Sequence, residues 1–238
     1  MIKVNYHGRL GNNMFQYCFG RILSEELHFN LDVKPIKYFS NIQPIKKYNF
    51  NLNNLCTEEL EKHEIDFISI INNKTPRIII LNGYFQRYEY YEKYLDKIKQ
   101  WLEIDLKYEN NFIINVNPKD FTLHIRLTDL AQLNLHPNMI KFYKDILDNN
   151  IFETLYIITD NKNDKRLIKI FKEYNYQIIS NSEIEDFLFI KKSNNIICSQ
   201  STFCWWAAIL SDAKNIYLPT NTHIGYYDRA DINLNFIS

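Results

Sequence analysis

Regular alternation of short apolar runs with amphipathic helical stretches is the feature that most constrains the fold of this chain. Apolar runs of strand length recur at residues 77–81, 121–126, 154–159, 176–180, 194–198 and 215–218. Helical stripes separate such runs, for example Leu167, Ile170, Phe171 and Tyr174 at i, i+3, i+4 and i+7. Strands that alternate with helices form βαβ units and parallel sheets, so the pattern predicts an α/β protein.

The alternation is most regular after Pro118, whereas residues 35–75 are irregular and rich in Asn and Lys. We therefore expect two Rossmann-like lobes that face each other over a cleft, with a boundary near residues 110–118. The expected division is residues 1–117 and residues 118–238, and the second lobe is predicted to contain a doubly wound parallel sheet.

Composition excludes several classes of protein. The 28 basic and 28 acidic side chains cancel, so no overall field attracts nucleic acid or an anionic membrane. Cys18, Cys56, Cys198 and Cys204 form no CxxC pair, which argues against a zinc site and a disulfide framework. The chain opens on a strand-like segment, and no run of about 18 apolar residues follows. We expect a cytoplasmic protein without a transmembrane segment.

The segment from Gly8 to Asn13 contains two of only five glycines in the chain and lies between a strand-like opening and a helix expected from Met14. Two interpretations are open at this point. The glycines form an ordinary tight turn, or they let the backbone approach a ligand at the start of the helix, where unpaired N–H groups attract anions and hydroxyls.

The segment from Leu123 to Asp129 ends another predicted strand. Alternation places Leu123 and Leu127 on one face and His124 and Arg126 on the other, so that Arg126 reaches the edge where α/β sheets bind ligands. Its guanidinium fork suits a diphosphate. An Arg126–Asp129 ion pair that finishes the strand is the structural alternative, and the two interpretations are compatible.

A third polar segment, 199–202, connects an apolar run to a helix that begins with two tryptophans. Ser201 or Thr202 caps this helix or helps to bind a phosphate there. Without a glycine the segment is not a P-loop. Trp205 and Trp206 are expected in the core. Asp160 and Asp186 also lie near the predicted ligand edge, where each either accepts hydrogen bonds from a base or ribose or acts as a helix cap.

These segments, taken in order, resemble the α-1,2-fucosyltransferases of glycosyltransferase family 11 within the GDP-fucose-dependent superfamily. The resemblance rests on five ordered motifs: Gly8 to Gly20, Gly83 to Tyr91, His124 to Asp129, Ile158 to Asn161 and Cys198 to Leu210. The Met-Phe-Gln and Thr-Phe-Cys-Trp-Trp agreements are beyond what an Asn- and Lys-rich composition produces.

The resemblance implies a GT-B-like, metal-independent, inverting transferase. It would move fucose from GDP-fucose to a glycan, with an N-terminal acceptor lobe and a C-terminal GDP-sugar lobe. Arg126 would neutralise the β-phosphate, and Asn12 would face the sugar and acceptor. The donor would also be bound by Gly8, Arg9, Gly11, His124, Asp129, Asp160, Asp186, Ser201 and Thr202. Contact with a membrane would be peripheral, through membrane-linked acceptors.

The chain departs from the family pattern at Leu127-Thr128, where Arg-Gly is usual, and at Asn13, where Gln is usual. The loss of a positive charge keeps open a transferase for another GDP-sugar. A shortened acceptor lobe and the lack of an assigned base also keep open a glycan-binding relative without turnover. Asp129, Asp160 and His136 are the candidate bases.

Overall fold

The computed structural model describes residues 1–49, 55–61, 65–114 and 116–219. It divides the chain into two compact units, Met1–Asp105 and Leu106 onward, whereas the sequence places the boundary between Asn117 and Pro118. The intervening segment is tied to the second unit, since Lys191 Nζ donates to Glu109 Oε1 over 2.7 Å and Lys192 Nζ donates to the Phe112 carbonyl. The expected roles of the two lobes stay predictions.

The first unit contains a sheet of order β2-β1-β4-β3, in which all pairs of named strands are parallel. Its strands and helices are β1 (Ile2–Val4), α1 (Leu10–Leu27), β2 (Leu31–Asp32), β3 (Thr57–Leu60), α2 (Phe67–Asn72), β4 (Ile78–Leu81) and α3 (Leu95–Trp101), with 3₁₀ turns at Tyr88–Tyr90 and Glu92–Tyr94. β3 lies within residues 35–75, which the sequence left unassigned, and β2 lies just before them. Neither strand was predicted, because each is short and only partly apolar.

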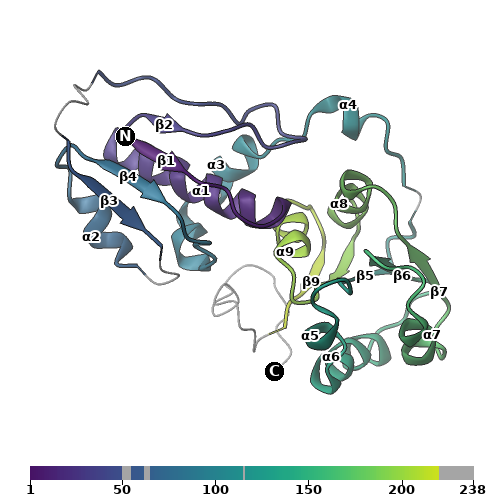
Figure 1. The fold of residues 1–238 in the computed structure, drawn as a ribbon. Helices are drawn as coiled ribbons and strands as arrows, with labels where there is room; N and C mark the ends of the chain where they lie inside the picture. Colours follow the sequence, from purple (N-terminus) through teal and green to yellow (C-terminus); the bar gives the residue numbers. More distant parts are fainter. Residues whose placement is uncertain (50–54, 62–64, 115, 220–238) are drawn as a thin grey trace. The chain divides into compact units, whose positions relative to one another are not determined.

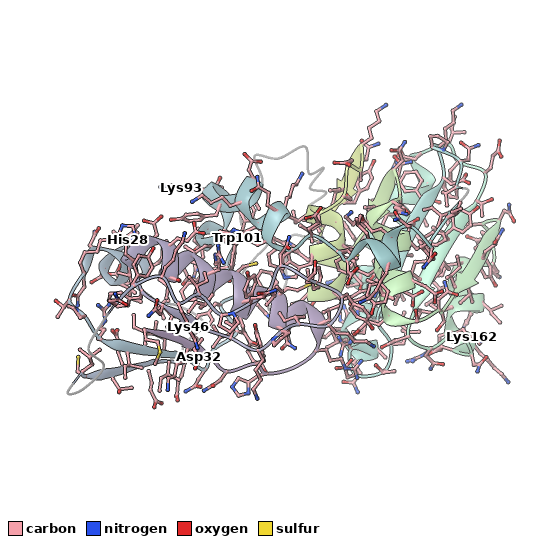
Figure 2. All side chains as sticks on the ribbon, turned by 90° about the horizontal axis from the view of Figure 1, so that it is seen from above. His28, Asp32, Lys46, Lys93, Trp101 and Lys162 are labelled. Atoms are coloured by element: carbon pink, nitrogen blue, oxygen red, sulfur yellow. The ribbon has the colours of Figure 1, made fainter. Side chains whose placement is uncertain are left out.

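Helix α1 begins at Leu10, earlier than the expected Met14, so Gly11 and Asn12 belong to its first turn. It packs closely on the sheet, since a Cβ at Gly20 would lie 2.5 Å from Val4 Cγ2. His28, labelled in Figure 2, ends the helix in the left-handed region at a φ of 57°. Because α1 packs tightly on the sheet, it fixes the position of the loop that precedes it.

The second unit contains a five-stranded parallel sheet of order β7-β6-β5-β8-β9. Its strands are β5 (Phe121–Ile125), β6 (Leu155–Thr159), β7 (Tyr176–Ile179), β8 (Asn195–Ile197) and β9 (Asn215–Tyr217). Its helices are α4 (Leu106–Glu109), α5 (Ala131–Asn134), α6 (Pro137–Asp148), α7 (Lys165–Phe171), α8 (Glu183–Lys191) and α9 (Thr202–Ile209). The α/β class and the doubly wound parallel sheet are confirmed.

Helices cover both faces of this sheet, with α6 and α7 on one side and α8 on the other (Figure 1). Leu123 and Ile125 of β5 join the core cluster of the α6 side, together with Leu127. The alternate residues face the α8 side, where Thr122 Oγ1 bonds Ser193 Oγ over 2.7 Å. Each large apolar side chain buried this way contributes about 1.5–3 kcal/mol. The predicted alternation along β5 is therefore confirmed.

Local signals explain where the helices of the second unit start. Pro137 occupies the first turn of α6 after His136, whose Nδ1 accepts from the Asn138 N–H. Asp164 caps α7, and Ser182 and Glu185 form a capping box at the start of α8. Among the described residues, none of the helices combines the length and apolar character that a membrane crossing needs.

Candidate active site at the carboxyl edge of the second sheet

The strand order of the second unit contains a topological switch point between β5 and β8. From β5 the chain adds β6 and β7 on one side and then returns to add β8 and β9 on the other. Ligands of open α/β sheets bind outside the carboxyl ends of the strands at such a point. The loops that follow β5 and β8, which carry Arg126 and Ser201, therefore form the expected site.

Arg126 follows β5 directly and forms a bidentate ion pair with Asp129. Nε lies 2.5 Å from Oδ1, and one terminal nitrogen lies 2.6 Å from Oδ2. The Arg126 side chain is mostly buried, whereas that of Asp129 is half exposed. The predicted ion pair is thus present, and it holds the guanidinium at the switch point by the edge that carries Nε.

Asp160, at the end of β6, organises the same loop. Its Oδ1 accepts the N–H of Leu127 at 2.7 Å and that of Thr128 at 3.3 Å, while Oδ2 accepts the Thr128 hydroxyl. Burial opposes ionisation, but these hydrogen bonds outweigh it and lower the pKa of Asp160 below its usual range. Asp160 is therefore an ionised group that fixes the backbone next to Arg126.

His124 lies buried on the α8 side of β5. Its Nδ1 is 3.2 Å from Ser199 Oγ, and its ring centroid is 5.6 Å from that of Phe203. Burial lowers the pKa of His124 to about 4; Asp160 opposes this shift and Arg126 adds to it. The imidazole is neutral at pH 7, so one ring nitrogen can donate a hydrogen bond and the other can accept one.

Asp186 occupies the first turn of α8, where its Oδ1 accepts the Asn181 N–H at 3.0 Å. Burial raises the pKa of Asp186 to about 6, against the Asn181 hydrogen bond and with help from the nearby Glu185 and Asp160. A buried carboxyl with a raised pKa beside a second carboxylate is typical of a functional site. Asp186 on α8 and His124 on β5 thus contribute buried ionisable groups to the second unit.

The start of α9 contains two polar atoms without hydrogen-bond partners. Ser201 is the N-cap residue but its side chain makes no capping bond, and both Ser201 Oγ and Gln200 Oε1 are buried without a partner among the described residues. Both residues are at least nine-tenths buried. A buried hydroxyl left unsatisfied costs about 1–3 kcal/mol, which a bound ligand would recover. Simple capping by the Ser201 side chain does not occur.

Two features hold this loop in shape. The Cys204 thiol lies 2.8 Å from Cys198 Sγ and so brings the two ends of the segment together. Asn134, fully buried in α5, accepts the Gln200 N–H through Oδ1 at 2.9 Å and donates from Nδ2 to the Arg126 carbonyl at 2.9 Å. The sequence did not identify Asn134 or Gln200, because an Asn or a Gln beside a loop has no distinctive spacing.

The loop before α1 in the first unit is shaped by neutral groups. Gly8 has a φ of +81°, and a Cβ there would lie 2.2 Å from Asn12 Nδ2. Asn12 Oδ1 accepts from Gln86 Nε2 at 2.9 Å. Gln16 links the same loop to the segment after β4, since it accepts the His7 N–H and donates to the Gly83 carbonyl. The first two sequence motifs are therefore in direct contact.

The remaining predicted residues are placed as follows. Arg9 is the exposed N-cap residue of α1, and Gly11 is buried in the first turn. Thr202 is the first residue of α9. Trp205 and Trp206 are buried, as expected for core residues. No group of three or more His, Cys, Asp or Glu side chains suited to a metal ion occurs within the described residues.

Comparison with known proteins identifies the family. The model of Glycosyl transferase family 11 matches residues 1–229. The chain belongs to this family. The O-antigen biosynthesis glycosyltransferase WbnK of Escherichia coli is 25% identical over 270 residues, which cover 86% of this chain and 88% of that protein. The crystal structure of POFUT1 in complex with GDP has a TM-score of 0.52 at 9% identity and covers 88% of this chain and 94% of that one.

The likeness to POFUT1 confirms the expected GT-B-like fold class. Within this glycosyltransferase, the departure from the family pattern at Leu127 has a clear structural consequence, because Leu127 is buried in the core on the α6 side. The neighbouring Thr128 bonds Asp160. The two positions thus serve the core and the shape of the loop, and neither adds a charge beside Arg126.

Proposed function

We propose that the protein transfers L-fucose from GDP-β-L-fucose to a hydroxyl of a glycan, forming an α-1,2 linkage to galactose in the synthesis of a surface glycan. Membership of family 11 supports transfer of a sugar. The observation that carries the proposal is the switch point itself, where Asn134 joins the backbone of Arg126 to the segment that starts α9, and where the Ser201 hydroxyl is unsatisfied among the described residues. A cation, a hydroxyl donor and a helix N-terminus together suit a diphosphate.

In this proposal, each part of the GDP-fucose donor contacts protein groups of matching chemistry. The β-phosphate takes the guanidinium of Arg126, held by Asp129, and the diphosphate also takes the hydroxyls of Ser201 and Thr202. Guanosine contacts His124, whose neutral ring offers a donor and an acceptor, and Asp186, whose carboxylate accepts N–H or ribose O–H groups. Asp160 contributes by holding the loop.

The reaction is an inverting displacement. The acceptor hydroxyl attacks the anomeric carbon from the side opposite GDP, the bond from that carbon to the phosphate oxygen breaks, and the electron pair leaves with GDP. Arg126 stabilises the negative charge that grows on the β-phosphate, which is the kind of electrostatic assistance that contributes several kcal/mol. The protein would need no metal ion for this step, because a cationic side chain neutralises the leaving group.

None of the three candidate bases is well suited to the role. Asp129 is bound to Arg126, and Asp160 accepts hydrogen bonds from Leu127 and Thr128. His136 is engaged at the start of α6. We therefore propose that the acceptor hydroxyl loses its proton late, to a phosphate oxygen of the departing GDP or to water, in a loose transition state that needs little help from a base.

The first test is thermal unfolding with GDP, UDP, ADP and GDP-fucose, with and without magnesium, for the wild type and Arg126→Ala. A ligand at about a hundred times its dissociation constant adds roughly 2.7 kcal/mol, a shift of several degrees in a chain of this size. We expect a GDP-selective shift that is independent of magnesium and lost in the variant. No shift with any nucleotide would contradict a donor site.

A second candidate is a transferase for another GDP-sugar. It is favoured by Leu127, whose burial in the core leaves the donor edge with one charge fewer than the family pattern. Competition among GDP-fucose, GDP-mannose and GDP-glucose separates the two, since a clear preference for GDP-fucose would remove this candidate. Transfer that disappears in Arg126→Ala would exclude a glycan-binding relative without turnover.

A further inference from the structure

Two buried asparagines connect β5 to β8, one at each end of the strands. At the amino ends, Asn195 Nδ2 donates to the carbonyls of Pro118 and Asp120, both at 3.0 Å. At the carboxyl ends, Asn134 bridges the Arg126 carbonyl and the Gln200 N–H, both at 2.9 Å. Both side chains thus join the β5 segment to the β8 segment by buried hydrogen bonds, at opposite edges of one sheet. Only the carboxyl edge, where Asn134 lies, is the expected ligand edge.

The bridge made by Asn134 joins the two loops that carry the candidate donor groups. Arg126 follows β5, and Gln200 immediately precedes Ser201 at the start of α9. The side chain is fully buried, so its two hydrogen bonds are shielded from water and are strongly directional. A backbone carbonyl and a backbone N–H are held by one planar amide group, which fixes the distance between the loops across the switch point.

We propose that Asn134 is a positioning residue for the donor diphosphate, an inference that rests on the proposed function. It sets the separation of the Arg126 guanidinium and the Ser201 hydroxyl, so that both reach one diphosphate. Without Asn134, each loop relaxes separately, and binding must restore an arrangement that the wild type already has. Asn134 touches no reacting atom and acts only through the two loops.

The test compares Asn134→Ala with Asn195→Ala, the matched control at the other end of the same strands. Both variants lose buried hydrogen bonds and a similar side-chain volume, so both are expected to lower thermal stability. GDP affinity is measured by titration calorimetry at a temperature where both variants are folded. We expect the dissociation constant for GDP to rise at least tenfold in Asn134→Ala and to change less than threefold in Asn195→Ala.

Amide hydrogen exchange without any ligand provides an independent readout. The Gln200 N–H donates to Asn134 Oδ1, so its exchange should become at least tenfold faster in Asn134→Ala and stay unchanged in Asn195→Ala. Asn134→Leu, which keeps the side-chain volume but lacks both polar atoms, should behave like Asn134→Ala. This variant separates the loss of the bridge from the creation of a cavity.

The outcomes distinguish this inference from the function on which it rests. If the wild type binds GDP and the two alanine variants weaken binding equally, the positioning role is wrong and the donor site stands. Unchanged exchange at Gln200 in Asn134→Ala would also overturn the bridge. If the wild type binds no GDP, the proposed function fails and this inference fails with it.

Discussion

The carboxyl edges of the two sheets differ in chemistry. After β1 in the first unit, the polar contacts join neutral amides to each other and to the backbone, as in Asn12–Gln86 and Gln16–Gly83. After β5 in the second unit, they involve ionisable groups, among them Arg126, Asp129 and Asp160. Parallel sheets of similar design therefore present different surfaces, because the residues in the loops decide what each edge can bind.

Buried groups support the loops at both edges. Behind the loop of the first unit, the rings of Phe19 and Phe85 stack with centroids 4.3 Å apart, and the Tyr91 hydroxyl donates to the carbonyls of Phe15 and Phe85. Behind the second edge, the Ser201 hydroxyl has no partner within the described part of the chain. At the first loop, Tyr6 OH and Asn13 Oδ1 are likewise buried without a partner within the described residues. The two edges therefore differ in charge and not in completeness, since only the second places a cationic side chain, Arg126, among its polar contacts.

The largest effect is expected when the charge of the second edge is removed. Arg126→Ala should lower kcat for fucosyl transfer by about 100- to 1,000-fold, because the leaving GDP loses its cation. Arg166→Ala is the control, since Arg166 forms the same bidentate geometry with Asp164 at 2.9 and 2.6 Å but lies at the exposed start of α7. Equal losses in the two variants, measured with GDP-fucose and a galactoside acceptor, would remove Arg126 from the mechanism.

The next largest effect concerns the backbone of the first edge. Gly8→Ala should lower the free energy of unfolding by about 2–4 kcal/mol, because the residue has a φ of +81° and a Cβ would clash with Asn12. GDP affinity should hardly change if the first edge is mainly a support. Urea unfolding of Gly8→Ala, Asn12→Ala and the double variant separates the clash from the cost of the φ angle. Additive losses would contradict the contact with Asn12.

Acidification should destabilise the protein through His124, which lies at the second edge. The pKa of His124 is about 4 in the folded chain and about 6.5 when unfolded, so its contribution to stability is full above pH 6.5 and is lost as the pH falls towards 4. From pH 7 to pH 5, titration of His124 should lower the free energy of unfolding of the wild type by roughly 2 kcal/mol. The variant His124→Gln should not show this loss. Identical pH profiles from urea unfolding would show that His124 is not held neutral.

Asp186 should change the pH dependence of stability in the direction opposite to that of His124. Its pKa is raised to about 6, so the folded chain favours the protonated carboxyl. Acidification through pH 6 removes the cost of burying the ionised carboxylate, and the contribution of Asp186 to stability therefore becomes more favourable. Asp186→Asn should therefore lose more stability than the wild type between pH 7 and pH 5. A smaller loss than that of the wild type would contradict the raised pKa.

The smallest effect separates binding from stability. Ser201→Ala should weaken GDP binding by about tenfold, as expected for one hydrogen bond to a charged group, and should leave the unliganded stability unchanged or higher because an unsatisfied hydroxyl is removed. Ser193→Ala is the control, since Ser193 Oγ is buried with two partners, Thr122 Oγ1 and the Phe189 carbonyl. It should lose stability and keep its affinity for GDP, and the reverse pattern would refute the role of Ser201.

Much of the second unit could be predicted from the sequence because its strands are short apolar runs between amphipathic helices. The alternation of Leu123, His124 and Ile125 along β5 was correct for the same reason. In the first unit, β2 and β3 escaped prediction, since Leu31–Asp32 and Thr57–Leu60 have too few apolar residues to form a pattern. Their place in the sheet depends on parallel pairing with β1 and β4, which sequence periodicity does not encode.

The candidate site could be predicted only in part. The position of Arg126 and Asp129 after a strand was enough to place them at the ligand edge. The bridge made by Asn134 depends on Gln200, which lies far away in the sequence, so no local sequence pattern predicts it. The unsatisfied hydroxyl of Ser201 is likewise visible only when all of its neighbours are in place.

Amide hydrogen exchange of the wild type with and without GDP is the most direct test of the central claim, that the donor binds at the carboxyl edge of the second sheet. We expect GDP to protect amides in residues 126–129 and 199–204, with little change in residues 8–13. Protection confined to the first unit, or none at a GDP concentration that saturates binding, would contradict the account.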